Sequence, residues 1–131
     1  MERLAGIAAG LPADVTLDFD AVPPDAVFPP ALARMVLNVL LLAADSLPEG
    51  GTVALAGRAD DLFFQIAGSK ASWPAGLALC LVNEAEALKA LDGGASLQMA
   101  FTALLAHASG IRLSSLFSPA GGNQPAILHL G

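Results

Sequence analysis

The sequence predicts an α+β fold: a two-layer α/β sandwich in which a mixed, mostly antiparallel sheet carries helices on one face. Three observations favour this class. Stretches with alternating apolar residues lie among stretches with helical apolar spacing. Two pairs of strand-like stretches are neighbours in the sequence and therefore predict hairpins. A chain of 131 residues fits one domain and buries roughly two-thirds of the surface that its unfolded form exposes.

The N-terminal part predicts a helix, a strand and a linker. Residues 2–10 favour a short helix that ends at Leu11-Pro12. Apolar and polar residues alternate over 15–20, which indicates a half-buried strand with an acidic outer face. Residues 21–30 contain four prolines and predict an extended linker. The chain is thus divided into an N-terminal helical remnant, 1–13, and a domain, 14–131.

The middle of the chain predicts a helix followed by a hairpin. Pro29-Pro30 suits the first turn of a helix over 31–47, which stops at the Pro48–Gly51 turn. This helix is apolar nearly all round, so we expect it to be covered on more than one side. Residues 52–57 and 62–67 predict two strands, and 58–61 the tight turn between them.

The C-terminal part predicts more helix and a second hairpin. A helical region spans about 75–91, in one piece or two, and Asp92-Gly93-Gly94 breaks it. The helix expected over 95–109 has one apolar side, formed by Leu97, Phe101, Leu104 and Leu105, and Gly110 terminates it. Residues 111–117 and 126–130 predict the closing hairpin.

The composition excludes several classes of protein. Hydrophobic residues make up 55% of the chain and charged residues 14%, a ratio at which a chain folds rather than staying disordered. The net charge is −6 and the six basic residues are scattered, so we expect neither nucleic acid nor a membrane surface as a partner. The longest apolar run, 35–44, is shorter than the about 20 residues of a spanning helix. We therefore expect a cytoplasmic protein.

Metal ligands are few in this sequence. The single cysteine, Cys80, excludes an internal disulfide and lies in an apolar run, which is typical of a small buried side chain. Two histidines beside it are too few for a zinc site. A magnesium cluster of Asp18, Asp20 and Asp25 is the alternative, but strand alternation alone puts the first two on one face. We expect a solvated edge there, no metal and no cofactor.

Two phrases of the sequence resemble the ATP-binding domain of sensor histidine kinases, which has the Bergerat fold. LNVLLLA at 37–43, followed by PEGGTV at 48–53, looks like the N-box helix of that family and its next strand. LLAHASGIRL at 104–113 looks like the last helix and strand. The resemblance covers about residues 14–131.

The nucleotide-binding boxes of that family are degenerate here. Asn38 stands in the N-box phrase, but the second asparagine, which helps to hold magnesium, corresponds to Leu42, which has no oxygen ligand. The next box, an aspartate followed by spaced glycines, corresponds to 68–72, where Gly68, Lys70 and Ser72 stand and no carboxylate remains for adenine. The third box, a glycine-rich turn that cradles phosphates, corresponds to about 95–98, where Ala95, Ser96, Leu97 and Gln98 stand.

A Bergerat domain without a nucleotide site, rich in Ala and Leu, is similar to one narrower family, the ChpT-type bacterial histidine phosphotransferases. The phrase AADSLPEGG at 43–51 is typical of it. The resemblance implies a homodimer in which an N-terminal helical hairpin carries the phosphorylated histidine. It also implies phosphate transfer between receiver domains of hybrid kinases and of response regulators. The acceptor aspartate and the magnesium belong to the receiver.

The hairpin and its phosphoacceptor phrase are absent from this sequence, so we do not expect the chain to carry phosphate. His107 lies near a helix end, where it interacts with the helix dipole, and no acidic neighbour follows it. His129 lies between Leu128 and Leu130 and points away from their shared face. The sequence therefore predicts a domain for docking with receiver domains. A nucleotide-binding kinase-type ATPase and a stand-alone dimerisation relic are the alternatives.

Overall fold

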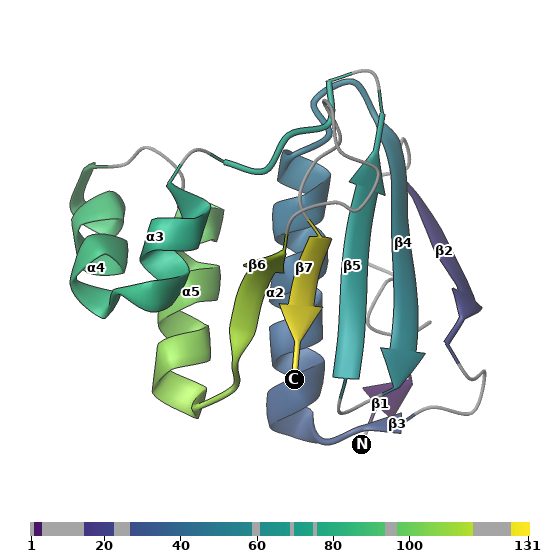
Figure 1. The fold of residues 1–131 in the computed structure, drawn as a ribbon, viewed down its shortest axis with the longest axis horizontal. Coiled ribbons are helices and arrows are strands. Elements are labelled where there is room, and N and C mark those ends of the chain that lie inside the picture. Colours follow the sequence, from purple (N-terminus) through teal and green to yellow (C-terminus); the bar gives the residue numbers. More distant parts are fainter. Residues whose placement is uncertain are drawn as a thin grey trace.

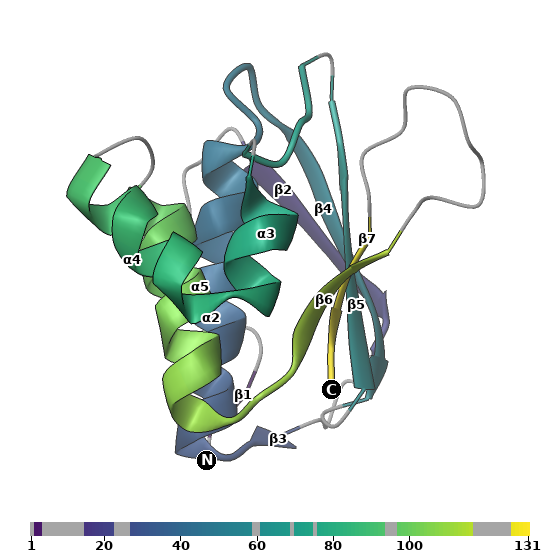
Figure 2. The ribbon, with the colours of Figure 1, turned by 60° about the vertical axis from the view of Figure 1, so that its left-hand side comes forward.

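The computed structural model describes residues 2–3, 15–22, 27–58, 61–68, 70–74, 76–93, 97–116 and 127–131. In this part of the chain a five-stranded sheet forms one layer, and the helices α2 to α5 lie together on one of its faces (Figures 1 and 2). The predicted α+β two-layer sandwich is confirmed. None of the helices in the described ranges has the length and apolar character that crossing a membrane requires.

The strand order of the sheet is β2-β4-β5-β7-β6. β2 (Val15–Ala21) runs parallel to β4 (Gly51–Arg58), because helix α2 carries the chain back between them. The other three pairs are antiparallel and add β5 (Asp61–Ala67), β7 (Ile127–Leu130) and β6 (Leu113–Leu116). Both predicted hairpins therefore form, although the strands of the second are shorter than 111–117 and 126–130.

The inner face of the sheet supplies half of the hydrophobic core. Alternate residues of the central strands are almost fully buried beneath the helices: Val53, Leu55, Leu62, Phe64, Ile66, Leu128 and Leu130. Gly57 allows the β4–β5 hairpin to close, because a Cβ at this position would lie 2.1 Å from the carbonyl oxygen of Asp61 and its φ is +106°. Residues 59 and 60 of the predicted turn lie outside the described residues.

Two predictions for the N-terminal part are wrong where the structure describes it. Glu2–Arg3 form strand β1, not the start of a helix, and they pair antiparallel with β3 (Val27–Phe28) inside the expected linker. The burial of Phe28, which has no exposed surface, brings this segment against the core. A buried backbone needs hydrogen-bond partners, and the two-residue pairing supplies them. Residues 4–10 of the expected helix lie outside the described residues.

Helix α2 (Pro30–Asp45) forms largely as predicted. Pro30 occupies its first turn, and the helix ends at Ser46, whose backbone N–H reaches the carbonyls of the last turn. Seven of its residues are buried: Ala33, Met35, Val36, Val39, Leu40, Leu42 and Ala43. The helix contacts both β4 and α5, so it is covered on two sides.

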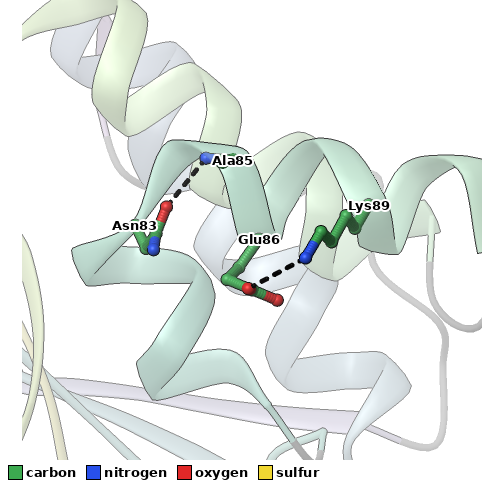
Figure 3. A network of polar contacts seen from close by, with 4 residues as sticks. All are labelled: Asn83, Ala85, Glu86 and Lys89. Carbon is green, nitrogen blue, oxygen red and sulfur yellow. Dashed lines mark hydrogen bonds and ion pairs between the residues drawn. The ribbon is translucent and has the colours of Figure 1, made fainter.

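The helical region over 75–91 consists of two pieces, α3 (Leu77–Val82) and α4 (Glu84–Gly93). Asn83 has an extended backbone between them, and its Oδ1 accepts a hydrogen bond of 3.0 Å from the N–H of Ala85 (Figure 3). One turn later, Lys89 Nζ lies 3.4 Å from Glu86 Oε1 (Figure 3). Asn83 thus ends one helix and caps the next.

Helix α5 (Leu97–Ser109) presents to the core a different side from the apolar one that the sequence indicates. Its buried residues are Met99, Ala100, Thr102, Ala103 and Ala106. Leu97 is 55% exposed and Phe101 is 56% exposed, whereas Leu104 and Leu105 are half-buried. The helix packs against α2, α3 and α4 at once, and alanines on the inner side allow this close approach.

Candidate functional site

The positions that correspond to the first and third nucleotide boxes meet between α2 and α5. Asn38 of α2 faces Gln98 and Thr102 of α5, and these three residues form what we call the polar cluster. Gln98 Nε2 lies 3.0 Å from Asn38 Oδ1 and 3.1 Å from Thr102 Oγ1. Two helices that are distant in sequence are thereby joined by their side chains.

Most hydrogen-bonding groups of the polar cluster have partners in the cluster or in the helix backbone. The two hydrogens of Gln98 Nε2 match its two short contacts, to Asn38 Oδ1 and Thr102 Oγ1. The Thr102 hydroxyl donates to the backbone oxygen of Gln98 at 2.7 Å, and Asn38 Nδ2 donates to the oxygen of Arg34 at 2.9 Å. In the described part of the chain, no buried side-chain nitrogen or oxygen lacks a partner. The side chains of Asn38, Gln98 and Thr102 are thus engaged mainly with one another and with the helix backbone.

Leu42 lies one helical turn beyond Asn38 on α2 and has no exposed surface. Its side chain belongs to the hydrophobic core. Within the described ranges, no three His, Cys, Asp or Glu residues are grouped in a way that could hold a metal ion. An aliphatic side chain at this position offers nothing to magnesium or to phosphate.

The segment that follows β5 packs against the C-terminal end of α2. A Cβ at Gly68 would lie 2.7 Å from the carbonyl oxygen of Gly50, so the two backbones approach closely. The N–H of Ser72 donates to the oxygen of Ser46 at 3.0 Å. Lys70 Nζ lies 3.6 Å from Glu49 Oε1 at the exposed surface. The described residues of this segment therefore make contacts within the chain itself.

The remaining predicted positions are not brought into the cluster. Leu97 stands at the first residue of α5 with its side chain largely exposed, and Ser96 lies outside the described residues. Gln98, the last residue of the third-box stretch, and Thr102 carry most of the contacts, and their bonding to Asn38 and to each other was not predicted from the sequence. Their signal was available: they are polar residues at i and i+4 in the apolar first half of the helix, so they lie on one face.

A comparison with protein families shows the family of the chain. The sequence model of the family described as "Histidine phosphotransferase C-terminal domain" matches residues 3–120, most of the chain. The chain belongs to this family. The resemblance to histidine phosphotransferases that the sequence indicates is thereby confirmed.

A solved structure supports the fold of this phosphotransferase domain. The structure of a bacterial phosphotransferase superposes on it with a TM-score of 0.57 and 18% sequence identity. The match covers 89% of this chain and 55% of the other, so the chain spans about half the length of that protein. None of the curated protein sequences compared with the chain matches it.

Both histidines of the phosphotransferase domain have structural partners. His107 Nε2 lies 2.9 Å from the backbone oxygen of Cys80, and because a carbonyl only accepts, this nitrogen donates. In an unbroken helix that oxygen would accept from the N–H of residue 84, so His107 replaces the bond lost at the α3–α4 break. His129 Nε2 pairs with the carboxylate of Asp61, and its ring stacks on Phe63 with centroids 4.7 Å apart.

Cys80 is a buried free thiol in α3, as its apolar surroundings predict. Burial raises the pKa of its thiol, and the nearby carboxylate of Glu86 raises it further. A thiol with a raised pKa stays protonated and is a poor nucleophile at neutral pH. Cys80 thus acts as a core residue.

Proposed function

We propose that this chain is an ATP-silent domain of a histidine phosphotransferase in a two-component phosphorelay and that it docks with receiver domains. The polar cluster carries the proposal. It joins α2 to α5 through Asn38 and Gln98, at the two nucleotide-box positions between which a kinase of the resembled family would bind phosphate and magnesium.

The chemistry of the cluster supports the loss of ATP binding. A nucleotide site needs free donors for phosphate and oxygen ligands for magnesium. Here Asn38 Oδ1 already accepts from Gln98, and Leu42 fills the neighbouring position with an aliphatic side chain. Admitting ATP would break the hydrogen bond that joins Asn38 to Gln98, two half-buried side chains, and would expose the buried side chain of Leu42.

The contacts of the two histidines argue against phosphate transfer at their Nε2 nitrogens. For Nε2 to accept a phosphoryl group, its lone pair must be free to attack. His107 donates its Nε2 hydrogen to Cys80, and His129 Nε2 is paired with Asp61. In this proposal neither histidine accepts phosphate, the domain works in the cytoplasm, and the division into 1–13 and 14–131 is retained as a prediction.

Calorimetric titration with ATP and magnesium tests the first half of the proposal. We expect no heat and no shift of the melting temperature up to millimolar nucleotide. Trp73, the single tryptophan, follows the 68–72 segment and gives a second readout through its fluorescence. An ATP-binding sensor kinase domain serves as the positive control. Saturable binding at micromolar ATP would show that the proposal is wrong and that the chain is a nucleotide-binding ATPase domain.

Titration with receiver domains tests the second half. The probes are the purified receiver domains of the response regulators and hybrid kinases encoded in the same genome. We expect at least one of them to bind saturably. If none binds at concentrations up to about 1 mM, where the free energy of binding is only about −4 kcal/mol, the docking role is refuted.

A further inference from the structure

Helices α3 and α4 lie at one side of the molecule and are held there mainly by α5. We call them together, residues 77–93, the helical pair. Figure 1 shows the pair at the left, with α4 outermost. Each of the two helices has the other and α5 as its main neighbours, and α3 also contacts β6. The pair is therefore joined to the rest of the domain mainly through one helix.

The helical pair buries few side chains. Its buried residues in the described part of the chain are small in number, whereas α2 alone buries seven: in the pair they are Leu77, Cys80 and Ala87. Other apolar residues of the pair stay in water, such as Leu79, which is 51% exposed, and Val82, which is 79% exposed. Separating the pair from α5 thus exposes much less apolar surface than unfolding the sheet does, so it costs less free energy.

The hydrogen bonds inside the pair do not depend on α5. The N–H of Asn83 donates to the oxygen of Leu79 at 3.0 Å, and the oxygen of Asn83 accepts from the N–H of Glu86 at 3.1 Å. Within α4, Lys89 Nζ lies 3.4 Å from Glu86 Oε1 (Figure 3). The pair can therefore move as one body and keep its own bonds.

A hydrogen bond from α5 ties the pair to the rest of the domain. His107 Nε2 donates to the backbone oxygen of Cys80 at 2.9 Å. A different part of α5 is fastened to α2, where Gln98 Nε2 lies 3.0 Å from Asn38 Oδ1. Movement of the pair away from α5 breaks the first bond and leaves the second one intact.

We propose that the helical pair opens from α5 while the sheet, α2 and α5 stay folded, and that His107 is the latch of this opening. The domain then has two folded states that share one sheet. A partner that binds one of them more tightly shifts the equilibrium between them. The opening also uncovers the thiol of Cys80, which is 4% exposed in the closed state. Because Cys80 is the single cysteine of the chain, its reaction with a thiol reagent follows the movement of α3.

Thiol labelling of the folded chain tests the proposal. Ellman's reagent is added at increasing urea, and global unfolding is followed by circular dichroism. We expect Cys80 to react at low urea at least about tenfold faster than global unfolding allows, and almost independently of urea, because a local opening exposes little surface. H107A, which removes the latch, should accelerate this reaction about fivefold. H107Q, whose Nε2 can donate to the same oxygen, should react within about twofold of the wild type.

A variant in the sheet separates local opening from global unfolding. Val53 has no exposed surface, and V53A destabilises the closed and the open state alike. It should therefore accelerate global unfolding and leave the reaction of Cys80 at low urea unchanged. If Cys80 instead reacts only as fast as the chain unfolds, and V53A accelerates both processes equally, no local opening exists and the inference is overturned. If H107A reacts at the wild-type rate, the thiol is reached without loss of the His107 bond, and the latch is refuted.

Discussion

Helices α2 and α5 face each other across the polar cluster, yet they differ in the size of most of the side chains that they bury. Helix α2 turns its large residues inward, among them Met35, Leu40 and Leu42, all without exposed surface. Helix α5 buries three alanines, Thr102 and one large residue, Met99, and leaves Leu97 and Phe101 largely exposed. Both helices are predominantly apolar, so hydrophobicity alone does not decide which face is buried.

The spacing between layers explains the difference. Helix α2 lies directly over the inner face of the sheet, where large side chains from both layers must interdigitate to fill the core. Helix α5 packs against helices on several sides, and small residues let helix backbones approach closely enough for Gln98 to reach Asn38. The close approach makes the polar cluster possible and leaves Leu97 and Phe101 outside the core.

Shortening Leu42 should have the largest effect on stability, because it removes a large side chain from the core beneath α2. Leu42→Ala removes a fully buried side chain, and we expect the free energy of unfolding to fall by about 2–5 kcal/mol. The matched control, Leu97→Ala on α5, should change it by less than about 0.5 kcal/mol. Urea denaturation followed by circular dichroism measures both. Equal losses would mean that α5 buries Leu97 as deeply as α2 buries Leu42.

Enlarging an inner alanine of α5 should have the next largest effect. Ala103 has no exposed surface, so Ala103→Leu overfills the space between helices and should cost about 1–3 kcal/mol. Ala108 lies on the exposed side, and Ala108→Leu is the control, with an expected change within about 0.5 kcal/mol. Thermal unfolding compares the two variants. A stabilised Ala103→Leu variant would show that space remains behind α5 and that close approach does not determine its orientation.

The same contrast explains how far the sequence could predict the fold. Helix α2 and strands β4 and β5 were predicted within a few residues because strong apolar periods mark them. The buried face of α5 was not predicted. Leu97 and Ala103 both count as apolar, and an apolar periodicity does not distinguish large side chains from small ones. Strands β1 and β3 have two residues each, too few for any period, and they form only through tertiary pairing.

The candidate site shows a similar limit. That Leu42 offers no ligand follows from its residue type alone. That Asn38 is occupied by Gln98 depends on a contact sixty residues away in the chain, which no local pattern encodes. The roles of His107 and His129 are likewise set by partners from other elements, Cys80 and Asp61. The loss of a function can therefore be inferred from the sequence where a required side-chain group is missing. It cannot be inferred where the group is present but already bonded to another residue, because only the structure shows that bond.

Removing the hydroxyl of Thr102 should have the smallest of the three effects and tests the cluster itself. Thr102→Val keeps the shape and the β-branch, so packing and helix propensity change little. Gln98 then loses one of its two short acceptors, and the free energy of unfolding should fall by about 1 kcal/mol. Ser109→Ala, an exposed hydroxyl at the end of the same helix, is the control and should have no measurable effect. If Thr102→Val is instead more stable than the wild type, apolar packing alone holds α5 to α2, and the polar cluster is a consequence of their close approach rather than a cause.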